Sequence, residues 1–456
     1  MVPIQLWRFD LTRSRRNRTN EPVIAVADVD SLSHDGRGVA HVDGKAVFID
    51  GALPGETVRY VEGRRRRSYS NGQLLEIISA SPDRVDPPCE YFGICGGCVM
   101  QHLARDAQLK AKQQVLLDSF VHIANIHPEE IIPPIYGSPW DYRRKARLGV
   151  RHVPKKGGIL VGFRERHKSY ITALSECKVL TESVSKLLPD LQRLVASLSI
   201  KERIPQIEVA EGDNATALVF RHLEAFSESD LKLLTEFAQQ HSIQLQLQPD
   251  NLQSIHSLSP EQVDELYYEL IQYGIKIYFR STDFIQVNAD INQRMVAKAV
   301  ELLDLNSSDC VLDLFCGVGN FSLAMARHAS EVIGVEGDGQ LVEQADINAN
   351  RNGIKNCKFF PADLYAEDDN LFANVPLPKI DKVLIDPPRT GAIEVINRIP
   401  ELNPRRMVYV SCNPATLARD SAIMVKHLGY RLIAAGIIDM FPNTAHVESI
   451  ALFDAA

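Results

Sequence analysis

The sequence lacks any long apolar segment. Its apolar runs all fall well short of the roughly 18 residues that a membrane-spanning helix requires. Near the N-terminus, Arg8, Asp10 and Arg13 interrupt the few apolar side chains, so residues 1–20 do not have the apolar core of a signal peptide. The composition, with 45% hydrophobic and 24% charged residues, is that of an ordinary globular protein. We therefore expect a cytoplasmic protein that has no membrane partner.

The sequence also lacks an excess of positive charge. Its formal net charge of -8 argues against a protein that coats nucleic acid indiscriminately. The basic residues are nevertheless clustered, in residues 1–20, in the unbroken run from Arg64 to Arg67, and in residues 139–178. One such cluster is often only a solvated face. Three basic clusters ahead of the C-terminal half favour a surface that contacts phosphates. Four aromatic residues lie in the third cluster, where they either stack on bases or belong to the core: Trp140, Tyr142, Phe163 and Tyr170.

Cysteine is scarce. Eight cysteines in a cytoplasmic chain of 456 residues favour metal ligands or catalysis over disulfides. Cys89, Cys95 and Cys98 have the spacing Cys-x5-Cys-x2-Cys, and Cys177 is a candidate fourth ligand far downstream. Three thiols this close can hold an iron-sulfur cluster, but four thiolates also satisfy a tetrahedral zinc site. Core cysteines without a ligand are the third interpretation.

The length predicts two to four domains. Residues 1–20 form a basic arm, and residues 21–80 read as a small β-barrel, because short apolar runs such as Ala46–Ile49 alternate with turn signals such as Asp43-Gly44. Residues 81–100 and 133–283 form a predicted α+β central domain. Its expected helices include Leu187–Leu198 and Glu261–Tyr273, and its expected strands include Thr216–Phe220 and Gln244–Leu247. Residues 101–132 and 284–456 make up the remaining domain.

The C-terminal half alternates apolar strands with helical stretches, which predicts a doubly wound α/β sheet. The expected strands are Val311–Phe315, Val332–Val335, Lys358–Phe360, Val383–Ile385, Met407–Val410, Ile433–Ile438 and Ser449–Phe453. Ligands of such sheets bind beyond the carboxyl ends of the strands. Four polar segments are Asp313–Asn320, Asp386–Arg389, Ser411–Pro414 and His446–Glu448. Each begins at or near the carboxyl end of an expected strand, except that Glu448 opens the last strand. If that last strand runs antiparallel to its neighbours, all four segments lie at the same edge of the sheet.

The first segment has the features of a nucleotide-cofactor loop. Gly317 and Gly319 permit a close backbone approach, and Glu336, at the end of the second strand, is placed to bind ribose hydroxyls. A dinucleotide site is the alternative. The missing third glycine, around Asn320, favours S-adenosylmethionine, which has no pyrophosphate to hold. We expect Phe315 and Asn320 to bind this cofactor.

Three further residues complete the predicted site. Asp363, just past the third strand, is placed to meet the adenine, although it could instead cap a helix. Asp386 is expected to line the cofactor pocket, and Arg389 the pocket of a target base. Cys412 lies between a strand and a helix start, a position that lowers the pKa of a thiol and favours a nucleophile. Its alternative role is that of a small buried apolar residue.

Together with the barrel and the cysteines, these segments resemble the bacterial RNA uracil-C5 methyltransferases over nearly the whole chain. The resemblance implies a Rossmann-like class I methyltransferase domain, an N-terminal OB-like TRAM barrel that binds RNA, and a central domain bearing a [4Fe-4S] cluster on Cys89, Cys95, Cys98 and Cys177. A barrel that serves only as a spacer remains the alternative. The segment 284–288 matches the family's Phe-x-Gln-x-Asn cofactor motif, so Gln286 is expected to bind S-adenosylmethionine rather than serve as a polar strand residue.

The resemblance also implies a reaction. The thiolate of Cys412 adds to carbon 6 of a uracil, carbon 5 accepts the methyl group, and Glu448 removes the proton from carbon 5. His446 is the alternative base. The target uridine must leave its stack, which favours folded single-stranded RNA. The resemblance further implies that residues near 101–132 pack on the catalytic domain.

The expected substrate is 23S rRNA. Within the family, a chain that carries both the barrel and the four cysteines is typical of the enzyme that modifies uridine 1939, while tRNA or another rRNA site remains the alternative. Two other classes stay open: a non-catalytic RNA-binding or assembly factor, and an amino-group methyltransferase using Asp386-Pro-Pro, in which Arg389 replaces the usual aromatic residue. We expect a monomer.

Overall fold

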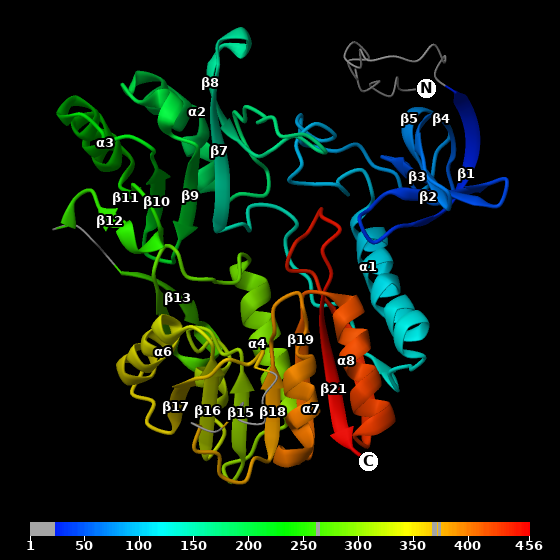
Figure 1. Ribbon diagram of the computed structural model, residues 1–456, viewed down its shortest axis with the longest axis vertical. Coiled ribbons are helices and arrows are strands. Elements are labelled where there is room, and N and C mark those ends of the chain that lie inside the picture. The colour runs from blue at the N-terminus through cyan, green and yellow to red at the C-terminus, as the bar shows by residue number, and fades with distance from the viewer. Residues whose placement is uncertain (1–22, 261–264, 367–371, 373–374) are drawn as a thin grey trace. The chain divides into compact units, whose positions relative to one another are not determined.

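The computed structural model describes residues 23–260, 265–366, 372 and 375–456 (Figure 1). The expected arm at residues 1–20 lies outside them. The chain divides into two compact units: unit 1 is Met1–Ala111, Arg164–Tyr170 and Asn443–His446, and unit 2 is Lys112–Phe163, Ile171–Pro442 and Val447–Ala456. Within the described ranges, no helix has both the length and the hydropathy that crossing a membrane requires. The domain boundaries expected from the sequence remain a prediction.

Unit 1 contains the expected β-barrel. Its strands are β1 (Ile24–Leu32), β2 (Gly38–Val42), β3 (Lys45–Asp50), β4 (Thr57–Arg65) and β5 (Tyr69–Ser79), closed in the order β1-β2-β3-β5-β4. Buried residues such as Val47, Ile49 and Tyr60 fill the interior. Closure needs a glycine at position 72, because a Cβ atom there would lie 2.7 Å from the Tyr60 ring. The turn signals and apolar runs therefore predicted this barrel correctly.

Unit 2 begins with a six-stranded sheet in the order β12-β11-β10-β9-β7-β8. The strands are β7 (Lys145–Val153), β8 (Gly158–Gly162), β9 (Gln206–Glu211), β10 (Thr216–Arg221), β11 (Gln244–Gln248) and β12 (His256–Ser257), with helices α2 (Glu182–Ser197) and α3 (Glu228–His241). The apolar stripe of α2, including Leu187, Leu191 and Leu194, is buried. These elements confirm the helix and both strands expected in this region.

A hairpin replaces the helix expected at Glu261–Tyr273. Residues 261–264 lie outside the described residues, but Leu266–Leu270 forms β13, which pairs antiparallel with β14 (Ile275–Phe279). The helix prediction is wrong there, because Leu266, Tyr268 and Leu270 are buried with the two-residue period of a strand. Gly274, with φ of 60°, makes the turn.

The larger sheet of unit 2 is the expected doubly wound one. Its order is β17-β16-β15-β18-β19-β21-β20-β6. The strands are β15 (Cys310–Leu314), β16 (Glu331–Glu336), β17 (Cys357–Pro361), β18 (Lys382–Ile385), β19 (Arg406–Ser411), β20 (Tyr430–Ile438), β21 (Glu448–Ala455) and the short β6 (Glu130–Ile131). All seven strands predicted from the sequence are present, and β21 runs antiparallel to β19, as anticipated.

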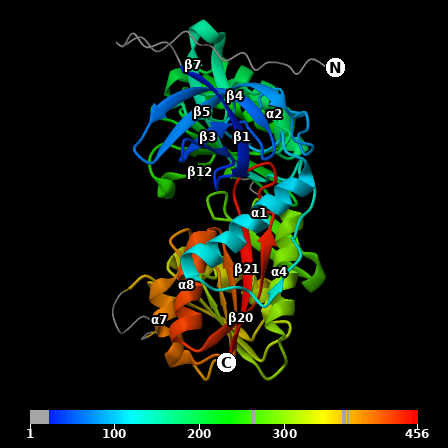
Figure 2. The same cartoon turned by 90° about the vertical axis from the view of Figure 1, so that its right-hand side faces the viewer.

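Helices cover both faces of this sheet. They are α4 (Ala289–Leu303), α5 (Ser322–Met325), α6 (Gly339–Arg351), α7 (Ile393–Leu402) and α8 (Pro414–His427). Figure 2 shows α7 and α8 on one face and α4 on the other. Upstream, α1 (Arg105–Ser119) is followed by a π-helical turn at Phe120–Ala124 and by β6, which pairs with β20. Part of the segment before β7, the short strand β6, thus belongs to the larger sheet.

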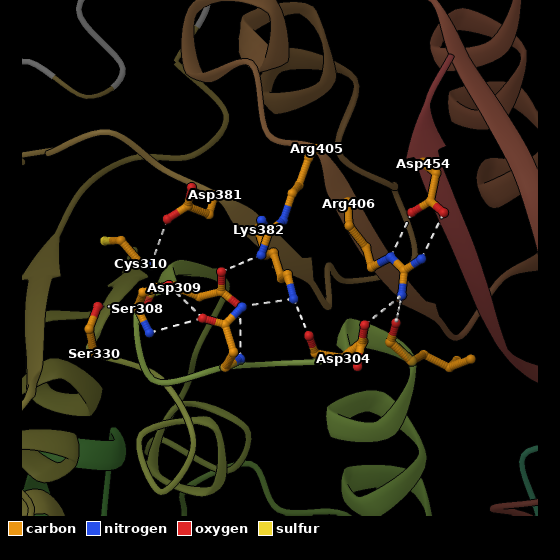
Figure 3. Close-up of polar contacts among 12 residues, drawn as sticks. Asp304, Ser308, Asp309, Cys310, Ser330, Asp381, Lys382, Arg405, Arg406 and Asp454 are labelled. Atoms are coloured by element: carbon orange, nitrogen blue, oxygen red, sulfur yellow. Dashed lines mark hydrogen bonds and ion pairs between the residues drawn. The ribbon is translucent and has the colours of Figure 1, made fainter.

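A network of ion pairs and hydrogen bonds lies at the edge of this sheet where β15, β18 and β19 begin (Figure 3). The Nζ atom of Lys382 lies 2.9 Å from the Asp309 carboxylate, and both side chains are at most 3% exposed. Arg405 also pairs with Asp309. Burial by itself raises the pKa of Asp309, but hydrogen bonds from Lys382 and the Asn306 N–H, together with the charges of Lys382 and Arg405, hold that pKa below 3.8. The ionised pair therefore stabilises the fold at neutral pH, and its contribution is lost as the pH falls through the lowered pKa.

Candidate active site

The strand register brings Cys412 and Glu448 together. Ser411, the last residue of β19, pairs with Ser449 in the antiparallel neighbour β21. Cys412 follows Ser411, and Glu448 precedes Ser449, so the two functional side chains belong to adjacent positions across the same strand pair. The Ser449 hydroxyl also donates to the Ser411 carbonyl at 3.4 Å. Cys412 and Glu448 are 36 positions apart in the sequence, and the hydrogen bonds of this strand pair fix their relative positions.

The turn that carries Cys412 is tied to the neighbouring loop. Asn413 is the N-cap of α8: its side chain accepts a hydrogen bond from the Ala415 N–H at 3.1 Å. The same amide donates to the Arg389 carbonyl at 3.0 Å. The Thr416 hydroxyl donates to that carbonyl as well, at 3.4 Å. These hydrogen bonds hold the Asp386–Arg389 segment against the turn that carries Cys412. The sequence predicted that the two segments lie close together, because each follows the end of a strand.

The pKa of Cys412 is raised, not lowered. Burial, and then the negative charges of Glu448 and Asp386, raise it to about 11, and the opposing effects of Arg389 and a backbone N–H do not compensate. The low thiol pKa expected from the helix start is therefore wrong, because burial of the thiol and the two carboxyl groups outweigh the effect of that position. A positively charged group bound in the pocket would favour the thiolate.

The carboxyl groups beside the thiol are also perturbed. Burial raises the pKa of Glu448 to about 7, against the opposing charges of Arg389 and Lys112. Burial, Glu448 and Asp313 raise the pKa of Asp386 well above its ordinary value. A carboxyl group that titrates near pH 7 is suited to accept a proton under physiological conditions. The arrangement thus offers a thiol and a base at one edge of the sheet.

The predicted cofactor loop follows β15. Gly317 has φ of 54°, and no atom lies within 4 Å of the position that a Cβ atom would occupy there, so the loop has open space beside it. The Gly317 N–H donates to Glu336 Oε2 at 3.1 Å, and the Gly337 N–H donates to Oε1 at 2.7 Å. The Phe315 ring lies 5.7 Å from that of Tyr365. Glu336 and Phe315 thus flank a turn whose backbone a ligand can approach.

The other three predicted cofactor residues differ in their exposure and in the hydrogen bonds that their side chains make. Asn320 accepts hydrogen bonds from Tyr268 Oη at 2.9 Å and Asn292 Nδ2 at 3.0 Å, and its Nδ2 donates to Asn292 Oδ1 at 2.9 Å. Asp363 is exposed and accepts a hydrogen bond from the Tyr365 N–H at 3.0 Å within a turn, and the described residues that follow it, 364–366, are not helical, so the helix-cap alternative is not supported. Gln286 is half-buried in the loop before α4, not in a strand. Their cofactor roles remain predictions.

Sequence reasoning missed several polar residues of unit 2. Asp313 is fully buried and accepts a hydrogen bond from Ser322, and burial raises its pKa to about 7. Lys112 and Asp439 form a buried ion pair, in which Lys112 Nζ lies 2.6 Å from Asp439 Oδ1. No local pattern marks Lys112, because its partner is more than 300 residues away. An aspartate directly after an apolar strand was the one signal available for Asp439.

The predicted metal ligands belong to two units. Cys89, Cys95 and Cys98 lie in unit 1, and Cys177 lies in unit 2. Among the described residues, no three His, Cys, Asp or Glu side chains are grouped as a metal site. The Gly97 N–H donates to Cys95 Sγ at 3.4 Å, a contact that thiolate ligands of clusters commonly receive. The four-cysteine site therefore remains a prediction.

Two other predictions concern the base and the RNA surface. His446 is exposed and belongs to unit 1, whereas Cys412 and Glu448 belong to unit 2.

Tyr142 is a core residue, since it is 6% exposed and its hydroxyl donates to the Pro442 carbonyl at 3.1 Å. Tyr170 is 61% exposed, so it is not a core residue, and its role in stacking on a base remains a prediction.

Comparison with known proteins relates this chain to two families. Residues 104–455 match the family described as tRNA (uracil-5-)-methyltransferase, and residues 26–59 match the TRAM domain. The chain is 48% identical over 443 residues to the 23S rRNA (uracil(1939)-C(5))-methyltransferase RlmD of Alkalilimnicola ehrlichii, covering 97% of this chain and 98% of that protein. It is 50% identical over 432 residues to the protein of the same name from Aromatoleum aromaticum, with 94% and 99% covered.

A solved structure shares the fold. The Pyrococcus abyssi tRNA (uracil-54, C5)-methyltransferase, in complex with S-adenosyl-L-homocysteine, is similar with a TM-score of 0.71 and 23% identity. The similarity covers 94% of this chain and 100% of that one. The class I methyltransferase fold and the TRAM barrel expected from the sequence are thereby confirmed.

Proposed function

Because this chain belongs to the RNA uracil-C5 methyltransferase family, we propose that it transfers the methyl group of S-adenosylmethionine to carbon 5 of a uridine in 23S rRNA, the position named uridine 1939 in its relatives. The observation that carries this proposal is the position of Cys412 and Glu448 next to the paired residues Ser411 and Ser449, at the ends of two adjacent strands. An acyl-transfer or hydrolytic enzyme would need a histidine or metal at this position instead.

The residues of the pocket fit the methyl donor. Glu336 accepts a hydrogen bond from the Gly317 N–H, open space lies beside Gly317, and Asp386 follows β18, the strand next to β15. S-adenosylmethionine, when bound, supplies a sulfonium methyl group that is open to attack by carbon. Its positive charge would offset the carboxyl groups that raise the pKa of Cys412. We infer that Gln286, Phe315, Asn320, Glu336, Asp363 and Asp386 make up this binding site.

The chemistry proceeds through the protein's own sulfur atom. Cys412 Sγ adds to carbon 6 of the uracil, and the electrons of the C5=C6 double bond move into the carbonyl at carbon 4 as an enolate. Carbon 5 then carries this nucleophilic character and takes the methyl group. The Glu448 carboxylate removes the remaining proton from carbon 5, and the electron pair restores C5=C6 while it expels Sγ. Arg389, whose charge acts on both groups, would line the pocket of the flipped base.

The assignment of the RNA is tested by mapping the product. Recombinant protein, labelled S-adenosylmethionine and unmodified 23S rRNA are expected to give one 5-methyluridine, located by nuclease digestion and mass spectrometry. Unmodified tRNA serves as the competing substrate. Label in tRNA alone would show that the chain acts on the other RNA class, and label in neither would remove the enzymatic function and favour an RNA-binding or assembly role.

We further propose that Cys89, Cys95, Cys98 and Cys177 hold a [4Fe-4S] cluster. The cluster would fix the segments that carry its ligands and takes no part in methyl transfer. Protein purified without oxygen is expected to be brown and to contain about four iron and four sulfide per chain, and Cys95→Ser is expected to lose both. A colourless protein with one zinc per chain would show that the four thiolates form a zinc site.

A further inference from the structure

The β13–β14 hairpin contacts the predicted cofactor loop. Tyr268 lies in the middle of β13 and is 6% exposed, and its hydroxyl donates to Asn320 Oδ1, in the loop after β15, at 2.9 Å. On β14, the N–H and the carbonyl of Tyr278 bond to the side chain of Asn348 on α6, at 2.9 and 3.0 Å. Asn348 Nδ2 also donates to the Val318 carbonyl at 3.0 Å. The hairpin is therefore joined to the cofactor loop at two points.

Two neighbours hold the side chain of Asn320. Its Oδ1 atom accepts hydrogen bonds from the Tyr268 hydroxyl and from Asn292 Nδ2, and its Nδ2 atom donates to Asn292 Oδ1 at 2.9 Å. A primary amide has two acceptor sites and two N–H groups. Both acceptor sites and one N–H group of Asn320 are therefore engaged. Its second N–H group has no acceptor among the residues that the structure describes.

The Tyr268 hydroxyl decides which way this amide faces. Two paired amides can exchange their nitrogen and oxygen atoms and keep both mutual hydrogen bonds, so Asn292 by itself does not orient Asn320. A buried phenol, however, needs an acceptor for its proton, and among the described residues Asn320 Oδ1 is that acceptor. Burial raises the pKa of Tyr268, so the hydroxyl keeps its proton at neutral pH. Asn320 thus presents an N–H group, not an oxygen, on its remaining side.

We propose that Tyr268 is a positioning residue that orients the Asn320 amide so that its remaining N–H group donates to the carboxylate of S-adenosylmethionine. This inference rests on the proposed function, in which Asn320 belongs to the cofactor site. Glu336 is assigned to the ribose hydroxyls and Asp363 to the adenine, which leaves the methionine end of the cofactor. The ammonium and sulfonium groups of that end are cations, so its carboxylate is the group that accepts a hydrogen bond. An amide oxygen facing the carboxylate would repel it.

Two ligands that differ at this carboxylate separate the positioning role from a structural one. Decarboxylated S-adenosylmethionine keeps the adenine, the ribose, the sulfonium and the amine. Tyr268→Phe removes the hydroxyl and keeps the buried ring, and the dissociation constants of both ligands are measured by calorimetry on the full-length protein. For this variant, we expect the dissociation constant of S-adenosylmethionine to rise about three- to tenfold, as the loss of one hydrogen bond requires, and that of the decarboxylated ligand to change less than about twofold.

The matched control is Tyr267→Phe. Tyr267 precedes Tyr268 on β13 and faces the opposite side of the strand, where its ring lies 5.6 Å from that of Tyr278. This variant also loses a phenol hydroxyl from the hairpin, but it should bind both ligands as the wild-type protein does.

A second variant tests the direction of the amide and decides the matter if Tyr268→Phe does not fold. Asn320→Asp puts an oxygen in place of the N–H groups, so it should weaken S-adenosylmethionine by roughly tenfold or more, because two carboxylates then face each other. The more cationic decarboxylated ligand should bind at least as tightly as before. Equal losses for the two ligands in either variant, or unchanged binding of S-adenosylmethionine by Tyr268→Phe, would overturn the inference. If the wild-type protein binds no S-adenosylmethionine, the proposed function itself fails, which is a distinct result.

Discussion

Replacing Cys412 by serine is expected to abolish turnover, with a loss of roughly 10³-fold or more in the rate of methyl transfer, as for other nucleophiles that act in a catalytic unit. A serine hydroxyl is far less nucleophilic than a thiolate, and the burial and carboxyl groups that already raise the pKa of Cys412 to about 11 would hinder ionisation of a hydroxyl even more. The measurement is the rate of incorporation of labelled methyl groups into unmodified 23S rRNA.

The matched control for this substitution is Cys310→Ser. Cys310 is a buried cysteine in the same sheet, at the opposite end of β15, where its N–H bonds to Asp381 (Figure 3). That variant should retain activity, and the Cys412 variant should still bind S-adenosylmethionine. If both variants lost activity equally, the effect would be one of folding, and if neither did, the thiol would have no chemical role.

Replacing Glu448 by glutamine is expected to stop the reaction after methyl transfer. Glutamine has the same shape but cannot accept the carbon 5 proton, so the methylated uridine should stay bonded to Cys412. Loss of a general base typically lowers turnover by about 10²- to 10⁴-fold. The substitution also removes a negative charge that raises the pKa of Cys412, so adduct formation should not be slowed. The measurement is the amount of protein-RNA complex that survives denaturing electrophoresis.

Glu331→Gln, at the other end of β16, is the control, since Glu331 pairs with Lys358 far from the thiol. It should form no persistent complex. Should Glu448→Gln turn over at the wild-type rate, His446 would become the base to examine. A Glu448→Gln variant that is inactive and forms no adduct would show that the carboxylate acts before, not after, the sulfur adds.

The sequence predicted those parts of the structure that depend on local pattern. The barrel follows from turn signals between short apolar runs, and the larger sheet follows from buried strands such as Val383–Ile385. Cys412 and Glu448 could be predicted as a pair because their motifs flank the ends of adjacent strands, and because an antiparallel β21 was anticipated. The family resemblance gave these residues their roles.

Features that depend on the folded environment could not be predicted in this way. The helix expected at Glu261–Tyr273 gave way to a hairpin, because pairing with β14 and burial of alternate residues outweigh the helical propensity of the segment. The thiol pKa is raised by burial in the folded protein and by carboxyl groups that come from two other strands. Lys112 reaches Asp439 only after the chain folds, so no spacing in the sequence reveals this buried ion pair.

The central claim is a transient bond between Cys412 Sγ and carbon 6 of the uracil. The most direct test incubates the wild-type protein with S-adenosylmethionine and 23S rRNA that contains 5-fluorouridine, in which fluorine cannot leave as a proton does. Mass spectrometry of the digested complex is expected to find a methylated fluorouridine nucleotide on the peptide that contains Cys412. A methylated product with no covalent complex, or an adduct on another residue, would contradict the account.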